Sequence, residues 1–460
     1  MKKLFIFASI FSALSAQASP SVANEINAEI TKRLLTVMSS NGCSERIWPG
    51  YSWENLTVVF IGDEVHQAFS AKEKRVFSVS SDQLPSAAIK TAYFFFKQKD
   101  GSEWMSINTA LDLSTGPKRN PEEVAKDNFR LAIHEGFHWV AQKNWHIYEG
   151  NRGTELPIRW EPRLYRSIMF SQLKAALAEK NQTETQLRKA RYWYDRWSSE
   201  YPDEVISTAD GYEGSARYSD WTGYALSELG CDASEAQLSV FVQSILDSNY
   251  GFAMNGDLFA FDVEGYELGS LAAFLLRRDY VNDDWQEKLS EGQSPVAILL
   301  EKFSPVFSEP DLAMQQKFKD SGKKFQEEAD KLVGHATALL AAHGTVFVSI
   351  PRSWYLGSFS PLGFFIDRAT NIQLVPMGMP LTFTSPSGTS AMRSELNAVF
   401  LSNPQAPCGS PSDWQFAVSG TKIHFSETGQ ARLEDSFFSG NLSGVTAQSA
   451  TGAQWFCAGE

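Results

Sequence analysis

The chain has 460 residues, of which 21% are charged, and its formal net charge is −13. This acidity argues against a nucleic-acid-binding protein, in which basic patches are expected. The length predicts two or three domains rather than one, and 13 tryptophans with 32 phenylalanines supply large side chains for hydrophobic cores.

The N-terminal stretch has the pattern of a signal peptide. Two lysines precede an apolar run over residues 4–14, and Ala16-Gln17-Ala18 supplies the small residues needed for cleavage. We therefore predict a signal peptide at 1–18 and export to the periplasm or the medium. No cysteine follows the cleavage point, so no lipid anchor is expected there. No later segment reaches the ~20 apolar residues needed to span a bilayer, which predicts no membrane span.

Four cysteines are present, none of them in a C-x-x-C pair. An exported chain with an even number of cysteines is expected to form disulfides. Three pairings are open, and we predict Cys408–Cys457, which would close the C-terminal region, together with Cys43–Cys231. Zinc ligation by these cysteines is the less favoured alternative.

The order of sequence patterns along the chain predicts an α+β protein. A helical pattern over 22–40 precedes strand-like runs from 55 to 108, with a hairpin turn at the Asp-Gly of "KDGS". Mostly helical periodicity follows to about residue 343, and short strand-like runs separated by Gly, Ser and Pro come after it. Beyond the signal peptide, we predict a mixed α/β section at 19–118, a mostly helical domain at 119–345 and a β-rich domain at 346–460.

One predicted helix, over about 121–143, carries the sequence His134-Glu135-Gly136-Phe137-His138. Residues four apart lie on one face of a helix, so both imidazoles can point at one zinc ion about 2 Å away. Glu135 is then placed to reach a water on that ion, as in the H-E-x-x-H motif of zinc metallopeptidases. The alternative is a pair of hydrogen-bonded core histidines beside a solvent-facing glutamate. Gly136 costs about 1 kcal/mol inside a helix, which suggests a close approach of substrate or of another helix.

A catalytic zinc usually takes three protein ligands and leaves one position open for water. The metzincin spacing is excluded because Ala141 and Asn144 stand where glycine and histidine are required. His146 has the wrong offset to share the ion. The two candidates are Glu213, beside small residues that permit close helix packing, and Glu161, at the expected start of a helix. Glu213 is favoured, although either could be an ordinary carboxylate near a helix N-terminus.

Three stretches in order, "HEGFH", "YEGSARY" and "GYELGSLAAFLL", resemble motifs of the gluzincin metallopeptidases. The likeness is to the aminopeptidase N-type branch and its glycyl-aminopeptidase relatives, over about residues 134–277. In that family the second motif is N-E-G-F-A-x-Y and the third is Y-x-K-G. The resemblance implies a zincin-like catalytic core, Glu213 as the third zinc ligand and Tyr266 as the residue that stabilises the transition state. Tyr212 and Tyr218 are alternatives to Tyr266.

The chain also departs from the family pattern. Tyr212 replaces the asparagine of the second motif, and Leu268 replaces the lysine of the third. The longer gap between the first two motifs implies a helical insertion over 143–210. The G-x-M-E-N sequence that holds a free α-amino group is absent, so aminopeptidase specificity does not follow.

These patterns together predict an exported zinc metallopeptidase with one Zn²⁺ per chain and Glu135 as the general base. Its partner would be a peptide or protein substrate rather than a nucleic acid. Two alternatives come from other classes. One is a secreted binding or adhesion protein in which zinc only stiffens the fold. The other is a zinc hydrolase of a non-peptide bond, such as an ester or a cell-wall amide.

Overall fold

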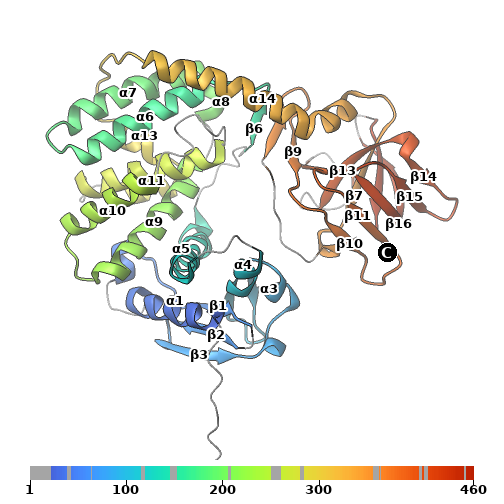
Figure 1. Ribbon diagram of the computed structural model, residues 1–460, viewed down its shortest axis with the longest axis horizontal. Helices are drawn as coiled ribbons and strands as arrows, with labels where there is room; N and C mark the ends of the chain where they lie inside the picture. The colour runs from blue at the N-terminus through green and yellow to red at the C-terminus, as the bar shows by residue number, and fades with distance from the viewer. Residues whose placement is uncertain are drawn as a thin grey trace, which may run out of the picture.

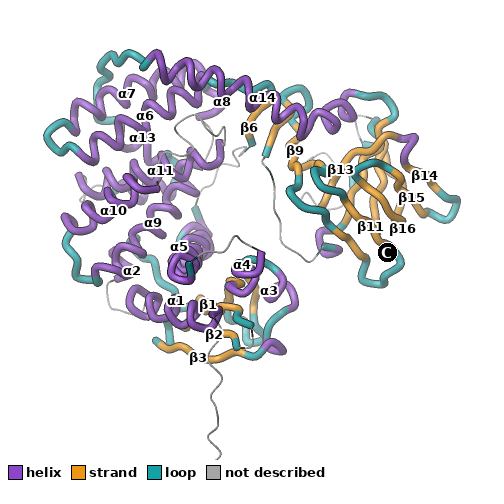
Figure 2. The backbone as a smooth tube through the Cα atoms, viewed as in Figure 1, coloured by secondary structure: helices purple, strands orange, loops and turns teal. Residues whose placement is uncertain are grey.

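The computed structural model describes most of the chain. The described residues are 22–38, 43–63, 65–115, 120–145, 153–205, 209–249, 261–279, 284–355, 362, 364–402, 407–408, 413–449 and 452–459. The predicted signal peptide and His146 lie outside them. The predicted α+β class, with a helical region and a β-rich C-terminal part, is confirmed (Figure 1). Figure 2 shows that the strands gather in two places, with helices between them.

The N-terminal part is a five-stranded mixed sheet with helices on both faces. Strands β1 and β5 run parallel in the centre, and every other neighbouring pair is antiparallel. The predicted hairpin is confirmed as the β4–β5 connection, where Gly101 takes a φ of +83°. The strands are, in spatial order, β3 (Arg75–Val79), β2 (His66–Ser70), β1 (Leu56–Ile61), β5 (Glu103–Asn108) and β4 (Tyr93–Lys97).

The two faces of this sheet pack against different helices. One face, with Val58 and Met105, joins the main hydrophobic core that α1 (Val22–Met38) and α5 (Pro121–Val140) complete. The other face packs against α3 (Ser86–Lys90). Two further short helices are α2 (Cys43–Ile47) and α4 (Thr109–Thr115).

Helix α5 begins and packs as its sequence indicates. The Asn120 side chain accepts a hydrogen bond from the backbone N–H of Glu122 at 3.0 Å, and proline occupies the first helical position. Its glycine, Gly136, faces a buried tryptophan: a Cβ at that position would lie 2.5 Å from the ring of Trp53. The close neighbour is therefore a side chain from the loop before β1 rather than another helix.

The middle of the chain is helical. Helix α9 (Ala209–Leu229) packs against α5 on one side and against α11 (Phe261–Asp279) on another. The backbones of α9 and α11 are in close contact, since a Cβ at Gly214 would lie 2.6 Å from Cα of Gly269. The other helices are α6 (Glu161–Ala178), α7 (Thr183–Glu200), α8 (Pro202–Val205), α10 (Glu235–Asn249), α12 (Trp285–Ser290), α13 (Pro295–Leu300) and α14 (Leu312–Ala341).

The C-terminal part is a second sheet, and α14 packs on one of its faces (Figure 1). One edge of the sheet comes from far upstream, because β6 (Thr154–Leu156) pairs in parallel with β8 (Phe365–Asp367). The remaining strands are β7 (Thr345–Ile350), β9 (Ile372–Pro376), β10 (Thr382–Thr384), β11 (Ala391–Ser394), β12 (Val399–Ser402), β13 (Trp414–Ser419), β14 (Ile423–Phe425), β15 (Gln430–Glu434), β16 (Phe438–Gln448) and β17 (Gln454–Ala458).

Both predicted disulfides are confirmed. Cys43–Cys231 joins α2 to the segment after α9, and Cys408–Cys457 joins β17 to the segment after β12. Among the described residues, no helix combines the length and apolar character that crossing a bilayer requires.

Candidate metal centre

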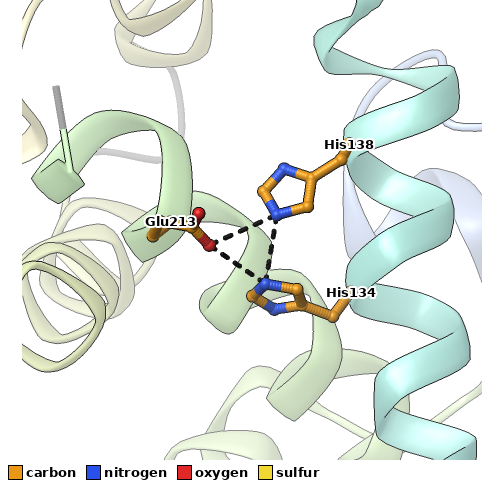
Figure 3. A group of neighbouring side chains, drawn as sticks. All are labelled: His134, His138 and Glu213. Carbon is orange, nitrogen blue, oxygen red and sulfur yellow. Dashed lines mark hydrogen bonds and ion pairs between the residues drawn. The ribbon is translucent and has the colours of Figure 1, made fainter. Parts of the chain in front are cut away.

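Two helices bring the H-E-x-x-H histidines and the favoured glutamate together. His134 and His138 project from one side of α5 toward Glu213 in the second turn of α9 (Figure 3). The Nε2 atoms of the two histidines are 3.1 Å apart. Oε2 of Glu213 lies 3.2 Å from Nε2 of His134 and 3.3 Å from Nε2 of His138. The three side chains are between 4% and 12% exposed, so their polar atoms meet away from bulk solvent.

The size of this triangle suits a zinc ion. Ligand atoms placed tetrahedrally at about 2.0–2.1 Å from zinc are about 3.3 Å from one another. The three observed separations, 3.1 to 3.3 Å, are close to that value. Two imidazole nitrogens and one carboxylate oxygen are also a donor set that zinc accepts. The described residues contain no second group of three or more side chains arranged in this way.

The orientation of His138 is set by Gln142, one turn further along α5. The Gln142 amide nitrogen donates to the backbone oxygen of Tyr212 at 2.7 Å and to Oγ of Ser215 at 2.8 Å. Its amide oxygen therefore faces Nδ1 of His138 and accepts a hydrogen bond from it. Nδ1 must then carry the proton, which leaves the Nε2 lone pair of a neutral His138 pointing at Glu213.

The orientation of His134 is set from the other side by Asp220. Nδ1 of His134 lies 3.2 Å from Oδ2 of this buried carboxylate. Burial raises the pKa of Asp220, but the nearby charges of Arg130 and Arg217 outweigh it and lower the pKa. Asp220 is therefore ionised and accepts the proton of Nδ1, so the Nε2 lone pair of a neutral His134 also points at Glu213.

Three lone pairs thus converge on one point, and this arrangement calls for a cation between them. Without a metal, a proton takes that role. Burial lowers the pKa of His134, but hydrogen bonds and charges from Asp220 and Glu213 outweigh it and raise the pKa to about 9. The residues present fit a divalent metal, because both imidazoles are held through Nδ1 with Nε2 toward Glu213, and a metal ion there would replace the proton of His134.

The remaining predicted residues lie outside the His-His-Glu triangle. Glu135 is half-buried on α5 next to His134. The ring of Tyr266, in the second turn of α11, stacks on His134 with centroids 5.6 Å apart. Glu161, the alternative ligand, is the first residue of α6 and does not belong to the His-His-Glu group.

The two alternatives to Tyr266 have different surroundings. Tyr212 stacks on His138 with centroids 4.2 Å apart, so it too borders the centre. Tyr218 is buried among core aromatics, and its hydroxyl accepts a hydrogen bond from Arg277 at 2.9 Å. Tyr218 is therefore occupied elsewhere.

Sequence reasoning missed Gln142 and Asp220. Both had a helical-spacing signal, because Gln142 follows His138 by four positions and Asp220 follows Glu213 by seven. Each therefore lies on the helix face that carries a ligand. The segment between the first two motifs contains α6, α7 and α8, as the resemblance implied, and also the strand β6. No family model, curated protein or solved structure matches this chain.

Proposed function

We propose that this chain is an exported zinc-dependent hydrolase that cleaves peptide bonds and is built on a zincin-like core. The observation that carries the proposal is the triangle of His134, His138 and Glu213, with separations that match three positions of a zinc tetrahedron. The packing of α5 against a mixed sheet supports the zincin-like core.

The number of ligands favours an enzyme over a protein stiffened by zinc. Structural zinc sites are closed by four protein ligands, whereas catalytic sites use three and keep one position for water. Among the described residues the group has three members. A purely structural site also has no use for an acid directly after its first histidine, where Glu135 stands.

Each side chain can then be given a role in peptide hydrolysis. A zinc ion in this group would supply a Lewis acid that lowers the pKa of water to about 7. Glu135 accepts the proton of the attacking water and passes it to the leaving amine. Tyr266 donates a hydrogen bond to the substrate oxygen as negative charge develops there. Gln142 and Asp220 keep the two imidazoles in the required tautomers.

Two features support export. The first 18 residues have the pattern of a signal peptide. Both disulfides, Cys43–Cys231 and Cys408–Cys457, suit an oxidising compartment.

The test is to substitute Glu135 with glutamine and digest a mixed peptide library. Glu135→Gln should bind zinc as the unsubstituted chain does but cleave at least about 100-fold more slowly, since general-base catalysis contributes 10²–10⁴-fold. Glu123→Gln, at an exposed position of the same helix, is the matched control and should cleave normally. Unchanged turnover in Glu135→Gln would remove the base, and a zinc-loaded chain that cleaves no peptide would overturn the peptidase proposal.

A further inference from the structure

A buried ionic cluster links α6 to α8 and to the two helices α9 and α11. Its members Arg163, Arg166 and Glu264 are at most 3% exposed, and Asp210 is 5% exposed. Burying charge is costly, and a buried salt bridge often contributes little net stability compared with apolar side chains of the same size. We therefore ask which side chains the cluster holds in place, rather than how much stability it adds.

Arg166 pairs with carboxylates on two helices and packs against a third helix. Its Nη1 donates to Oδ2 of Asp210 at 3.2 Å, and its Nη2 donates to the other oxygen of that carboxylate. Its Nε donates to Oε2 of Glu264 at 3.0 Å. The guanidinium also lies 4.8 Å from the ring centroid of Trp197 on α7. A planar fork with fixed donors on two sides sets both distance and direction, which an ammonium group cannot do.

The two carboxylates are in the first turns of the helices that build the centre. Asp210 precedes Glu213 by three residues on α9, and Glu264 precedes Tyr266 by two residues on α11. The start of α9 also touches α11 directly, because a Cβ at Gly265 would lie 2.6 Å from Cβ of Ala209. A shift of Asp210 relative to α6 therefore moves the carboxylate that faces the two histidines.

We propose that Arg166 is a positioning residue for the metal centre. By holding Asp210 and Glu264 together, it fixes Glu213 and Tyr266 opposite His134. The inference depends on the metal site of the proposed function but does not depend on which bond is cleaved.

Arg163 provides an internal comparison. It lies on the same helix, is equally buried, and donates to the same Glu264 oxygen at 2.7 Å. It also donates to Glu204 on α8. Replacing either arginine disturbs the same buried cluster, but Arg166 is the one whose guanidinium pairs with both oxygens of Asp210, on the helix that carries Glu213.

The experiment compares Arg166→Lys with Arg163→Lys in the full chain. Zinc affinity is measured by competition with a chelator, and the visible spectrum of the Co²⁺-loaded protein reports the ligand geometry. Arg166→Lys should weaken zinc binding about 10- to 100-fold, the range seen when a residue supporting a ligand is lost. Its Co²⁺ spectrum should shift toward that of Glu213→Ala. Arg163→Lys should keep both the affinity and the spectrum, while its thermal midpoint falls as much as that of Arg166→Lys.

Equal zinc affinities in the two folded variants would overturn the inference and leave the proposed function intact. If the unsubstituted chain bound no zinc, both proposals would fail. Should Arg166→Lys not fold, Asp210→Asn and Glu204→Gln serve as the corresponding pair. Weaker zinc binding in Asp210→Asn alone supports the inference, and equal binding in both overturns it.

Discussion

Nδ1 of His134 lies 3.2 Å from Oδ2 of Asp220, and this contact leaves the other ring nitrogen for the metal. Replacing Asp220 with alanine should weaken zinc binding about 10- to 100-fold, since partners of ligating histidines carry that much affinity. Chelator competition measures the effect. Asp127→Asn is the control: this carboxylate also pairs with Arg130, but it is 45% exposed and should leave the affinity unchanged. Equal affinities in the two variants would contradict a role for Asp220.

The raised pKa of His134 predicts a specific pH dependence. In the metal-free chain the folded-state pKa is about 9, above the ordinary value of 6.5. Zinc must displace the proton held below pH 9, so the apparent zinc affinity should rise about tenfold per pH unit toward that pH. The stability of the metal-free fold changes in the opposite direction with pH. The protonated ring stabilises the fold fully below pH 6.5, and this stabilisation is lost as the pH rises through about 9.

Calorimetry in buffers of different ionisation enthalpy should find about one proton released per zinc at pH 7. An affinity that stays constant from pH 6 to pH 8 would show that His134 is already neutral in the metal-free chain.

Direct substitution separates the two candidate third ligands. Glu213→Ala should lower the metal content well below one zinc per chain after dialysis, because only two protein ligands remain. Glu161→Ala should retain about one zinc, since Glu161 lies outside the His-His-Glu group. Elemental analysis of the two proteins decides the matter, and the opposite ranking would move the third ligand to α6.

Two helical glycines should respond to alanine in opposite directions. At Gly136 an added Cβ would lie 2.5 Å from the buried ring of Trp53. Gly136→Ala should therefore destabilise the fold by about 1–3 kcal/mol, the usual cost of overpacking. At Gly334 in α14 an added Cβ meets nothing within 4 Å. Gly334→Ala should stabilise by up to about 1 kcal/mol, through helix propensity alone. Urea unfolding of the two variants measures both changes.

Local patterns in the sequence were enough to predict much of the fold. The N-cap and proline at 120–121 and the helical spacing of His134 and His138 depend on neighbours within a few residues, so periodicity and capping rules were enough. Glu213 was harder to identify, because 75 positions separate it from His138, and it was favoured on its small neighbours and on the order of the motifs.

Other features depend on contacts between distant segments. Trp53 meets Gly136 across more than 80 residues, and Arg166 reaches both Asp210 and Glu264. The sequence of one segment does not indicate such partners, because the packing of distant elements brings them together. The same reason explains β6: three residues in a helical region have a weak strand pattern, and only pairing with β8 makes them a strand.

Strand β6 also limits how the chain can be truncated and how it could have arisen by gene fusion. Because residues 154–156 complete the edge of a sheet whose other strands begin at Thr345, a cut anywhere between β6 and β7 separates this edge strand from its sheet. Expression of 345–460 alone would leave the edge of β8 bare and open to aggregation. A gene fusion that simply appended the last quarter of the chain, residues 345–460, would not have produced this topology.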